Sequence, residues 1–251
     1  MQKDQISLFI HHFMKGTFFK LLSCFLSLFL IIGCGKTNDN LKIATAANMQ
    51  FAMEELIDAF EAETQIDAEM ILSSSGKLTA QIQAGAPFDL FFSADTKYPE
   101  QLAAKGLSNE PEVYANGQLV AWFKKDEYKF ELYAMANPRT APYGKATEEY
   151  LSNTEKELPD VVYGESISQV NQFLLSGTVD AGFTSLSSVM SEKFSEEGNW
   201  ELIPDSLHSP IAQAYVLLDG SDRKEEAKAF IDFLASERAK GILVAYGYKV
   251  N

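Results

Sequence analysis

Cysteine and histidine are scarce in this chain of 251 residues, which holds two cysteines and three histidines. A zinc or iron–sulfur site built from these residues needs about four of them close together. We therefore expect no metal-cation site. A catalytic device that depends on histidine would have to use His208, because His11 and His12 lie close to the N-terminus.

Basic residues are also few, with 21 Lys and Arg against 35 Asp and Glu, for a net charge of −14. Such a balance disfavours a nucleic-acid-binding protein, which neutralises phosphates with Lys and Arg. It equally disfavours attachment to anionic lipid through a basic patch. The composition is otherwise that of an ordinary globular protein, and the length suits two lobes of about 100 residues each.

A hydrophobic run long enough to span a membrane is missing from the N-terminal region. The uncharged run from Leu21 to Gly35 has 15 residues, whereas a spanning helix needs about 20. Because Lys15 and Lys20 precede it, the run is typical of a signal peptide. A buried core helix or a signal-anchor is the alternative interpretation. Translation starting at Met14 instead of Met1 would give a signal peptide of more usual length.

The end of this run, Ile31-Ile32-Gly33-Cys34, resembles a bacterial lipobox. That resemblance implies cleavage before Cys34 and a lipid on the Cys34 thiol. We therefore expect a signal peptide at residues 1–33 and a polar tether at 34–40. The exported protein would be attached to the membrane only through the Cys34 lipid. With Cys24 removed, no disulfide could form within the chain.

Strand-like and helix-like segments alternate after the tether. A short apolar run at Leu41–Ala46 is followed by apolar residues with helical spacing from Met49 to Phe60, with Asn48 where an N-cap belongs. The alternation predicts α/β lobes with helices on both faces of mostly parallel sheets. Further strands are expected at Ile66–Leu72, Asp89–Ser93, Gln118–Phe123, Val161–Tyr163, Val179–Thr184 and Ile211–Leu218.

Four turns between a strand and a helix stand out as candidate binding positions: Asn48, Ser75, Tyr143 and Ile167. In open α/β sheets, ligands bind beyond the carboxyl ends of the strands. A helix N-terminus offers free N–H groups and partial positive charge, so it binds anions without Lys or Arg. The alternative is that these residues are ordinary helix caps that bind nothing.

Several longer segments resemble the periplasmic molybdate-binding protein family. The likeness covers nearly all of the chain after the tether, and its most specific part has matching order and spacing over more than twenty residues. The segments are ATAAN at 44–48, SSSGKL at 73–78, GAPFDLFFSAD at 85–95, ANP at 136–138, APYG at 141–144, GF at 182–183 and YGY at 246–248.

The resemblance implies a type II periplasmic-binding fold, with two α/β lobes that close on an oxyanion and deliver it to an ABC-transporter permease. Lobe I would comprise residues 41–119 plus 214–251, and lobe II residues 120–213. The segment between Phe123 and Ala136 is shorter than in the family, so lobe II is expected to be trimmed at one edge.

Residue by residue, the family's side-chain ligands match Asn48 and Ser75, and its backbone donors match Tyr143 and Ile167. Some members also use a tyrosine hydroxyl, and Ser185 stands in its place here. That contact would be shorter, water-mediated or absent.

The chemistry of molybdate agrees with these positions. Molybdate and tungstate are fully deprotonated dianions at neutral pH, so they accept hydrogen bonds and donate none. None of the four matched positions is an Asp or Glu. We therefore expect a monomeric binding protein without enzymatic activity or cofactor, which takes molybdate or tungstate. The alternatives are sulfate or another tetrahedral anion, ferric ion, and a lipid-anchored hydrolase with paired carboxylates.

Overall fold

The computed structural model describes residues 40–125, 130–195 and 198–250. The chain divides into two units, 1–39 and 40–251, and the fold that follows is that of the second. The expected signal peptide, Cys34 and the tether up to residue 39 lie outside the described residues. Within the described ranges, no helix combines the length and the apolarity needed to cross a membrane.

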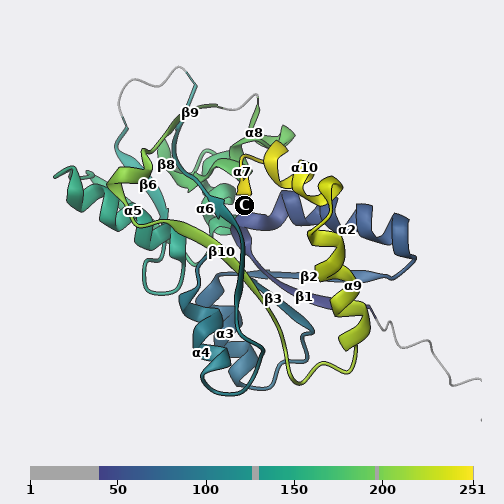
Figure 1. The fold of residues 1–251 in the computed structure, drawn as a ribbon. Coiled ribbons are helices and arrows are strands. Elements are labelled where there is room, and N and C mark those ends of the chain that lie inside the picture. The colour runs from purple at the N-terminus through teal and green to yellow at the C-terminus, as the bar shows by residue number, and fades with distance from the viewer. Residues whose placement is uncertain (1–39, 126–129, 196–197, 251) are drawn as a thin grey trace, which may run out of the picture. The chain divides into compact units, whose positions relative to one another are not determined.

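The first sheet has six strands: β1 (Leu41–Ala46), β2 (Ala68–Ser73), β3 (Leu90–Ser93), β4 (Glu112–Gly117), β10 (Ile211–Leu217) and β11 (Lys249–Val250). Their order is β11-β4-β10-β3-β1-β2, and Figure 1 labels β10, β3, β1 and β2 of this sheet. Strand β1 is parallel to both of its neighbours, β2 and β3. Strand β10 is antiparallel to β3 and β4, and β11 is antiparallel to β4.

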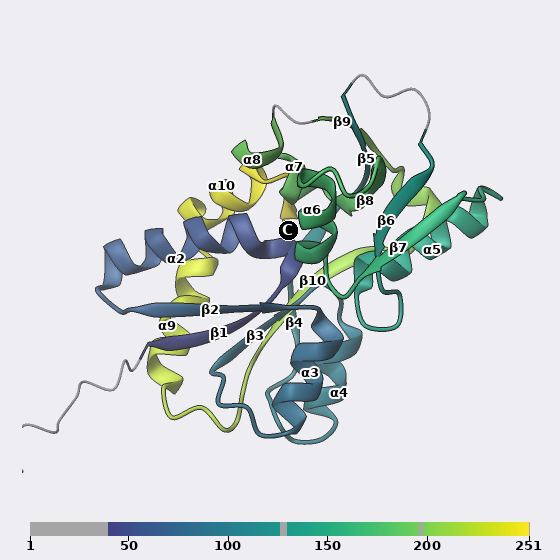
Figure 2. The same ribbon diagram turned by 180° about the vertical axis from the view of Figure 1, so that it is seen from behind.

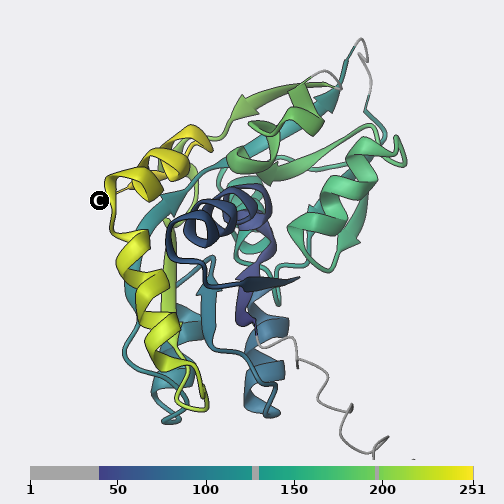
Figure 3. The same ribbon diagram turned by 90° about the vertical axis from the view of Figure 1, so that its right-hand side faces the viewer.

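Successive side chains of the first sheet pack on opposite faces, as the two-residue period of a strand requires. Ile43 and Phe92 belong to an apolar cluster with α2 (Gln50–Thr64), α9 (Lys224–Leu234) and α10 (Glu237–Ala245). Their neighbours Ala44 and Phe91 belong to another, with α3 (Ser75–Gln83) and α4 (Lys97–Ala103). Both faces of the sheet are therefore covered by helices. Figure 3 shows the yellow C-terminal helices beside α2, which is drawn in dark blue.

The second sheet has five strands: β5 (Leu119–Lys124), β6 (Leu132–Ala136), β7 (Asp160–Gly164), β8 (Ala181–Ser185) and β9 (Gly198–Leu202). Their order is β7-β6-β8-β5-β9 (Figure 2). Strand β6 is parallel to β7 and β8, whereas β5 is antiparallel to β8 and β9. The helices in the part of the chain between β5 and β10 are α5 (Pro142–Asn153), α6 (Ile167–Leu175), α7 (Leu186–Val189), α8 (Glu192–Ser195) and the 3₁₀ turn η3 (Asp205–Leu207).

The predicted pair of α/β sheets with flanking helices is confirmed, but the sheets are mixed rather than mostly parallel as expected. Some of the antiparallel strands could not be predicted from the sequence. Strands β4, β9 and β11 were not expected from the sequence, since β4 (EVYANG) alternates little and ends on glycine. Strand β4 pairs with the apolar β10, β9 pairs with β5, and β11 pairs with β4. Long-range pairing, rather than local preference, therefore makes these segments strands.

The chain passes from the first sheet to the second at Gln118, the single residue between β4 and β5. It returns between the end of β9 and the start of β10. The expected lobe limits, 41–119 plus 214–251 and 120–213, stay a prediction. In the stretch between Phe123 and Ala136, which was expected to be short, residues 126–129 lie outside the described residues. Strand β6, which follows them, pairs with β7.

Candidate functional site

The four residues singled out in the sequence, Asn48, Ser75, Tyr143 and Ile167, line one small pocket. The side chains are deeply buried, with no residue of the four more than 3% exposed. The pocket has about 190 Å³ of empty volume, a figure that includes space open to solvent. Its remaining lining residues are Ala46, Ala47, Ser74, Ala94, Ala141 and Pro142. No carboxylate, Lys or Arg is among these lining residues.

Three helices begin at this pocket, and each presents N–H groups that have no partner within its own first turn. Helix α3 begins at Ser75 and α6 begins at Ile167. Helix α5 begins at Pro142, which has no N–H, so the first N–H that α5 can offer is that of Tyr143. The positive ends of three helix dipoles therefore meet at the pocket, which favours an anion there.

The start of α6 shows how the local sequence leaves a backbone donor free. The Ser166 side chain is the N-cap and accepts the N–H of Gln169 at 3.4 Å. The Gln169 side chain in turn accepts the N–H of Glu165 at 2.7 Å. This reciprocal arrangement is close to a capping box. The cap uses the third N–H of the helix, and no backbone hydrogen bond among the described residues uses the Ile167 N–H at its first position, so that donor can serve a ligand.

Ser75 is arranged to donate its hydroxyl proton. Its Oγ accepts the backbone N–H of Ala94 at 3.0 Å, so the acceptor side of the hydroxyl is occupied. The Ser75 proton is then free to point at an acceptor in the pocket. The Ser75 side chain is 0% exposed and is oriented by the end of a neighbouring strand, so its hydroxyl is preorganised to donate to a ligand.

Ser74 is a pocket residue that the sequence reasoning missed. It is the N-cap residue of α3, but its side chain makes no capping hydrogen bond. Its Oγ is buried and has no partner among the residues that the structure describes. A buried hydroxyl without a partner is costly, so Ser74 is a further candidate donor. The run of three serines at 73–75 was the available signal, and it could not show which hydroxyls face the pocket.

The expectation that Asn48 caps a helix is not met. Asn48 lies inside the 3₁₀ turn η2 (Ala47–Met49), whose N-cap is Ala46. Its side-chain Nδ2 donates to Gln213 Oε1 and to the Tyr248 hydroxyl, both at 2.9 Å. Both amide protons are therefore used within the protein. The donor that Asn48 can still offer to the pocket is its backbone N–H.

The surroundings of Asn48 form a buried hydrogen-bond network between distant parts of the chain. The Ser187 hydroxyl donates to the Asn48 carbonyl at 2.5 Å, and the Tyr248 hydroxyl lies 3.1 Å from the same oxygen. Burial raises the pKa of Tyr248 well above its usual value, so its hydroxyl stays protonated at neutral pH. This contact could not be predicted from the sequence, because Asn48 and Tyr248 are 200 residues apart.

Ser185, the remaining predicted position, is not among the residues that line the small pocket. It is the N-cap of α7, where its Oγ accepts the Ser188 N–H at 3.2 Å. The hydroxyls of Ser187 and Ser188 lie 2.9 and 2.7 Å from it. Its hydroxyl is therefore engaged in this cap, and a ligand contact from Ser185 stays a prediction.

We assign no ligand contact to the Tyr143 hydroxyl. It packs against the end of β4, where a Cβ on Gly117 would lie 2.1 Å from the Tyr143 oxygen. This hydroxyl is buried without a hydrogen-bond partner among the described residues. Burial, followed by the nearby Tyr248 and Tyr114, raises its pKa well above the usual value, and weaker interactions with the Asn48 side chain and the Gln118 backbone oppose that shift. Tyr143 therefore offers the pocket its backbone N–H, while its ring fills the region where the chain crosses between sheets.

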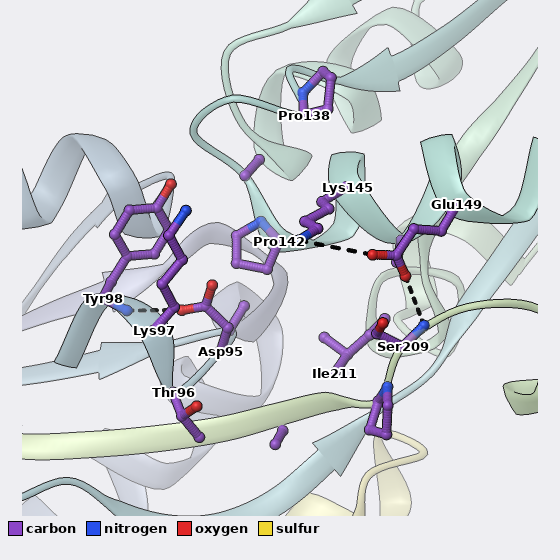
Figure 4. A pocket seen from close by; sticks show the side chains of 15 residues that line it. Asp95, Thr96, Lys97, Tyr98, Pro138, Pro142, Lys145, Glu149, Ser209 and Ile211 are labelled. Carbon is purple, nitrogen blue, oxygen red and sulfur yellow. Dashed lines mark hydrogen bonds and ion pairs between the residues drawn. The ribbon is translucent and has the colours of Figure 1, made fainter. Parts of the chain in front are cut away.

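A larger pocket, with about 720 Å³ of empty volume, shares Ala94, Ala141 and Pro142 with the small one. Figure 4 shows its two sides, with Asp95 to Tyr98 on one and the helix that carries Lys145 and Glu149 on the other. Burial raises the pKa of Asp95, although hydrogen bonds from Tyr98 and Ser93 oppose that effect. This pocket holds the charged groups, and the small pocket beside it holds neutral donors.

The described residues contain no group of three or more His, Cys, Asp and Glu that could hold a metal ion. The lining of the small pocket is suited to surrounding a small anion with N–H and O–H donors. A buried anion is stable only when its oxygens are hydrogen-bonded.

Comparison with known proteins gives consistent matches over the described part of the chain. The model of the bacterial extracellular solute-binding protein family matches residues 41–249. The molybdate-binding protein ModA of Azotobacter vinelandii is 32% identical over 235 residues, covering 87% of this chain and 93% of that protein. A putative ABC transporter substrate-binding lipoprotein, YvgL of Bacillus subtilis, is 29% identical over 243 residues, covering 87% of this chain and 93% of that protein.

The solved structures agree with these relatives. The periplasmic molybdate-binding protein of Azotobacter vinelandii superposes with a TM-score of 0.78 at 30% sequence identity, covering 84% of this chain and all of that one.

Proposed function

Because this chain belongs to the bacterial extracellular solute-binding protein family, we propose that it captures molybdate outside the cytoplasm and delivers it to an ABC importer. Tungstate, which has nearly the same size and charge, is expected to bind in the same way. The proposed ligand contacts are the backbone N–H groups of Asn48, Tyr143 and Ile167, together with Ser75. The protein is proposed to act as a binding protein rather than an enzyme and to need no cofactor.

The observation that carries this proposal is the composition of the small pocket. Its lining offers N–H and O–H donors from three helix starts and contains no carboxylate. Molybdate at neutral pH has only acceptor oxygens, so every one of these donors can be used. Monohydrogen phosphate carries a proton that needs an acceptor, and the pocket lining offers it no carboxylate.

Sulfate is the main alternative ligand, because it is also a fully deprotonated tetrahedral dianion. It is smaller than molybdate, so the same donors would hold it with longer contacts. Ferric ion is disfavoured because hard cations are bound by anionic oxygen ligands, and the pocket presents donors instead. A lipid-anchored hydrolase would need two carboxylates facing each other across a pocket. None lines the small pocket. In the larger one Asp95 accepts hydrogen bonds from Ser93 and Tyr98, and Glu149 is held by the Ser209 N–H and Lys145, so both carboxylates have structural partners.

A thermal-shift panel tests the function directly. Molybdate or tungstate at about 100 times its dissociation constant should raise the melting temperature by roughly 5–10 °C, because binding to the folded state alone adds about 2.7 kcal/mol of stability. Sulfate should give a smaller shift, and phosphate and ferric citrate none. A larger shift with sulfate or ferric citrate than with molybdate would contradict the assignment.

We also propose that the exported protein is a monomer held at the membrane by a lipid on Cys34. The lipobox-like segment before Cys34 supports the lipid attachment, as does the similarity to a protein described as a lipoprotein. In cells, a Cys34→Ala variant should move from the membrane fraction to the soluble exported fraction. Fractionation with metabolic labelling by a fatty acid measures both effects. Unchanged membrane association together with an unlabelled wild type would contradict the proposal.

A further inference from the structure

Two helix starts that line the pocket are joined to each other by a direct backbone hydrogen bond. The N–H of Gly76, the second residue of α3, donates to the carbonyl of Thr140 at 2.9 Å. Gly76 follows Ser75, and Thr140 lies just before α5, which begins at Pro142 and carries Tyr143. The bond therefore fixes how far Ser75 stands from Tyr143, although neither Gly76 nor Thr140 lines the pocket.

The acceptor side of this contact is held rigidly by its own turn. The Thr140 and Ala141 N–H groups both donate to the Asn137 carbonyl, at 3.2 and 2.9 Å. The Asn137 side chain also accepts the Arg139 N–H at 3.1 Å. Because the turn is tied back to Asn137, its carbonyls at Arg139 and Thr140 are presented outward towards α3 and α4.

Tyr98 of α4 makes a second contact with the same turn. Its hydroxyl donates to the Arg139 carbonyl at 3.1 Å. In Figure 4, Tyr98 lies on the opposite side of the larger pocket from Pro142 and Lys145. The contact thus joins a helix packed on the first sheet to the loop that follows β6 of the second sheet.

Gly76 fits this place because it has no side chain. A Cβ at this position would lie 2.7 Å from the Tyr98 hydroxyl oxygen and 2.9 Å from the Thr140 carbonyl oxygen. The second of these atoms is backbone and cannot turn aside. Any larger residue would therefore push the turn and α3 apart by a few tenths of an ångström.

We propose that Gly76 and Tyr98, with the carbonyls of Arg139 and Thr140, form a clasp that retains the anion by holding the two halves of its site together. The inference rests on the proposed function. Gly76 and Tyr98 are positioning residues here, because they hold the ligand donors in place without donating to the ligand. The exposed ion pair between Lys77 and Glu165, at 2.8 Å, spans the same gap but is expected to add little in water.

The test is the dissociation rate of molybdate from Gly76→Ala and Tyr98→Phe, measured by stopped flow. Tyr98→Phe removes one hydrogen bond, and the dissociation rate should rise about fivefold. Gly76→Ala should raise it at least tenfold, because its methyl group separates the parts of the clasp. The association rate should stay within about twofold, because a clasp formed after binding chiefly affects dissociation.

Stability without ligand separates a clasp from a merely structural role. Alanine favours helix over glycine, so ligand-free Gly76→Ala should melt at or slightly above the wild-type temperature while it releases ligand faster. Gly241→Ala is the matched control, because it makes the same change within α10, where a Cβ would meet nothing within 4 Å. It should leave the dissociation rate unchanged.

The outcomes separate a failure of the proposed clasp from a failure of the proposed function. If the wild type binds molybdate and both variants release it at the wild-type rate, the clasp is overturned and the function stands. If the wild type binds none of the anions, the function is overturned. The clasp falls with it, because a clasp that forms after binding then has no anion to retain.

Discussion

Replacing Ser75 with alanine is expected to weaken molybdate binding by roughly tenfold to a hundredfold. A hydrogen bond to a charged group contributes about 1.5–3 kcal/mol, which corresponds to that range. The Ser75 hydroxyl is buried and oriented by the Ala94 N–H, so the lost proton donor cannot be replaced by a neighbour of the same geometry. Titration calorimetry of the variant against the wild type gives the ratio of dissociation constants.

Two further variants control this experiment. Ser108→Ala also removes a buried serine hydroxyl, one that donates to the Asn109 carbonyl outside the pocket, and should bind molybdate like the wild type. Tyr143→Phe removes a buried hydroxyl with no partner among the described residues but keeps the N–H, so it should also bind nearly as well. If Tyr143→Phe lost binding while Ser75→Ala kept it, the donors would have been assigned wrongly.

Ser75→Ala also leaves the Ala94 N–H without its acceptor. An unpaired buried N–H costs about 1–3 kcal/mol, so the variant should melt a few degrees lower without ligand. The fold should persist, because the apolar residues of α3, such as Leu78, pack independently of the hydroxyl. The stability loss and the affinity loss are therefore separate quantities, and calorimetry at a temperature well below the melting point measures the second alone.

The positions of the pocket residues could be predicted because they follow local rules. Tyr143 comes directly after a proline at a helix start, and Ser166 marks the start before Ile167. Both patterns are visible within a few residues of sequence. Since ligands of open α/β sheets bind at strand ends, residues at such starts were expected to meet, and the structure places them around one pocket.

The roles of individual side chains could not be predicted in the same way. Asn48 looked like a helix cap, but its amide is used by Gln213 and Tyr248, which lie 165 and 200 residues away in sequence. Ser74 and Ser75 are adjacent and chemically identical, yet only Ser75 has a partner on its oxygen. Such differences depend on which strand end packs against each side chain in the folded protein, and no local sequence pattern contains that information.

The clasp illustrates the same limit. Gly76 belongs to the segment SSSGKL, whose resemblance to a known family was visible, but its glycine had no evident reason in the sequence. The reason is a carbonyl from a turn 64 residues later in the chain and a tyrosine hydroxyl from α4, both within 3 Å of where a Cβ would stand.

Replacing Ile167 with proline should remove a single backbone donor from the pocket and keep the helix. Proline is favoured at the first position of a helix, where its missing N–H breaks no helical bond. The preceding residue must be extended, and Ser166 already has φ −156° and ψ 169°. The variant should therefore fold, and the anion should lose one charge-assisted hydrogen bond.

The matched control is Ile167→Ala, because both variants lose the buried isoleucine side chain and only proline loses the N–H. Each should be destabilised by about 2–5 kcal/mol through the lost packing. The difference in molybdate affinity between the two then isolates the backbone donor, and proline should bind roughly tenfold to a hundredfold more weakly than alanine. Equal affinities in calorimetry, with the helix content of both variants intact by circular dichroism, would show that the start of α6 does not bind the anion.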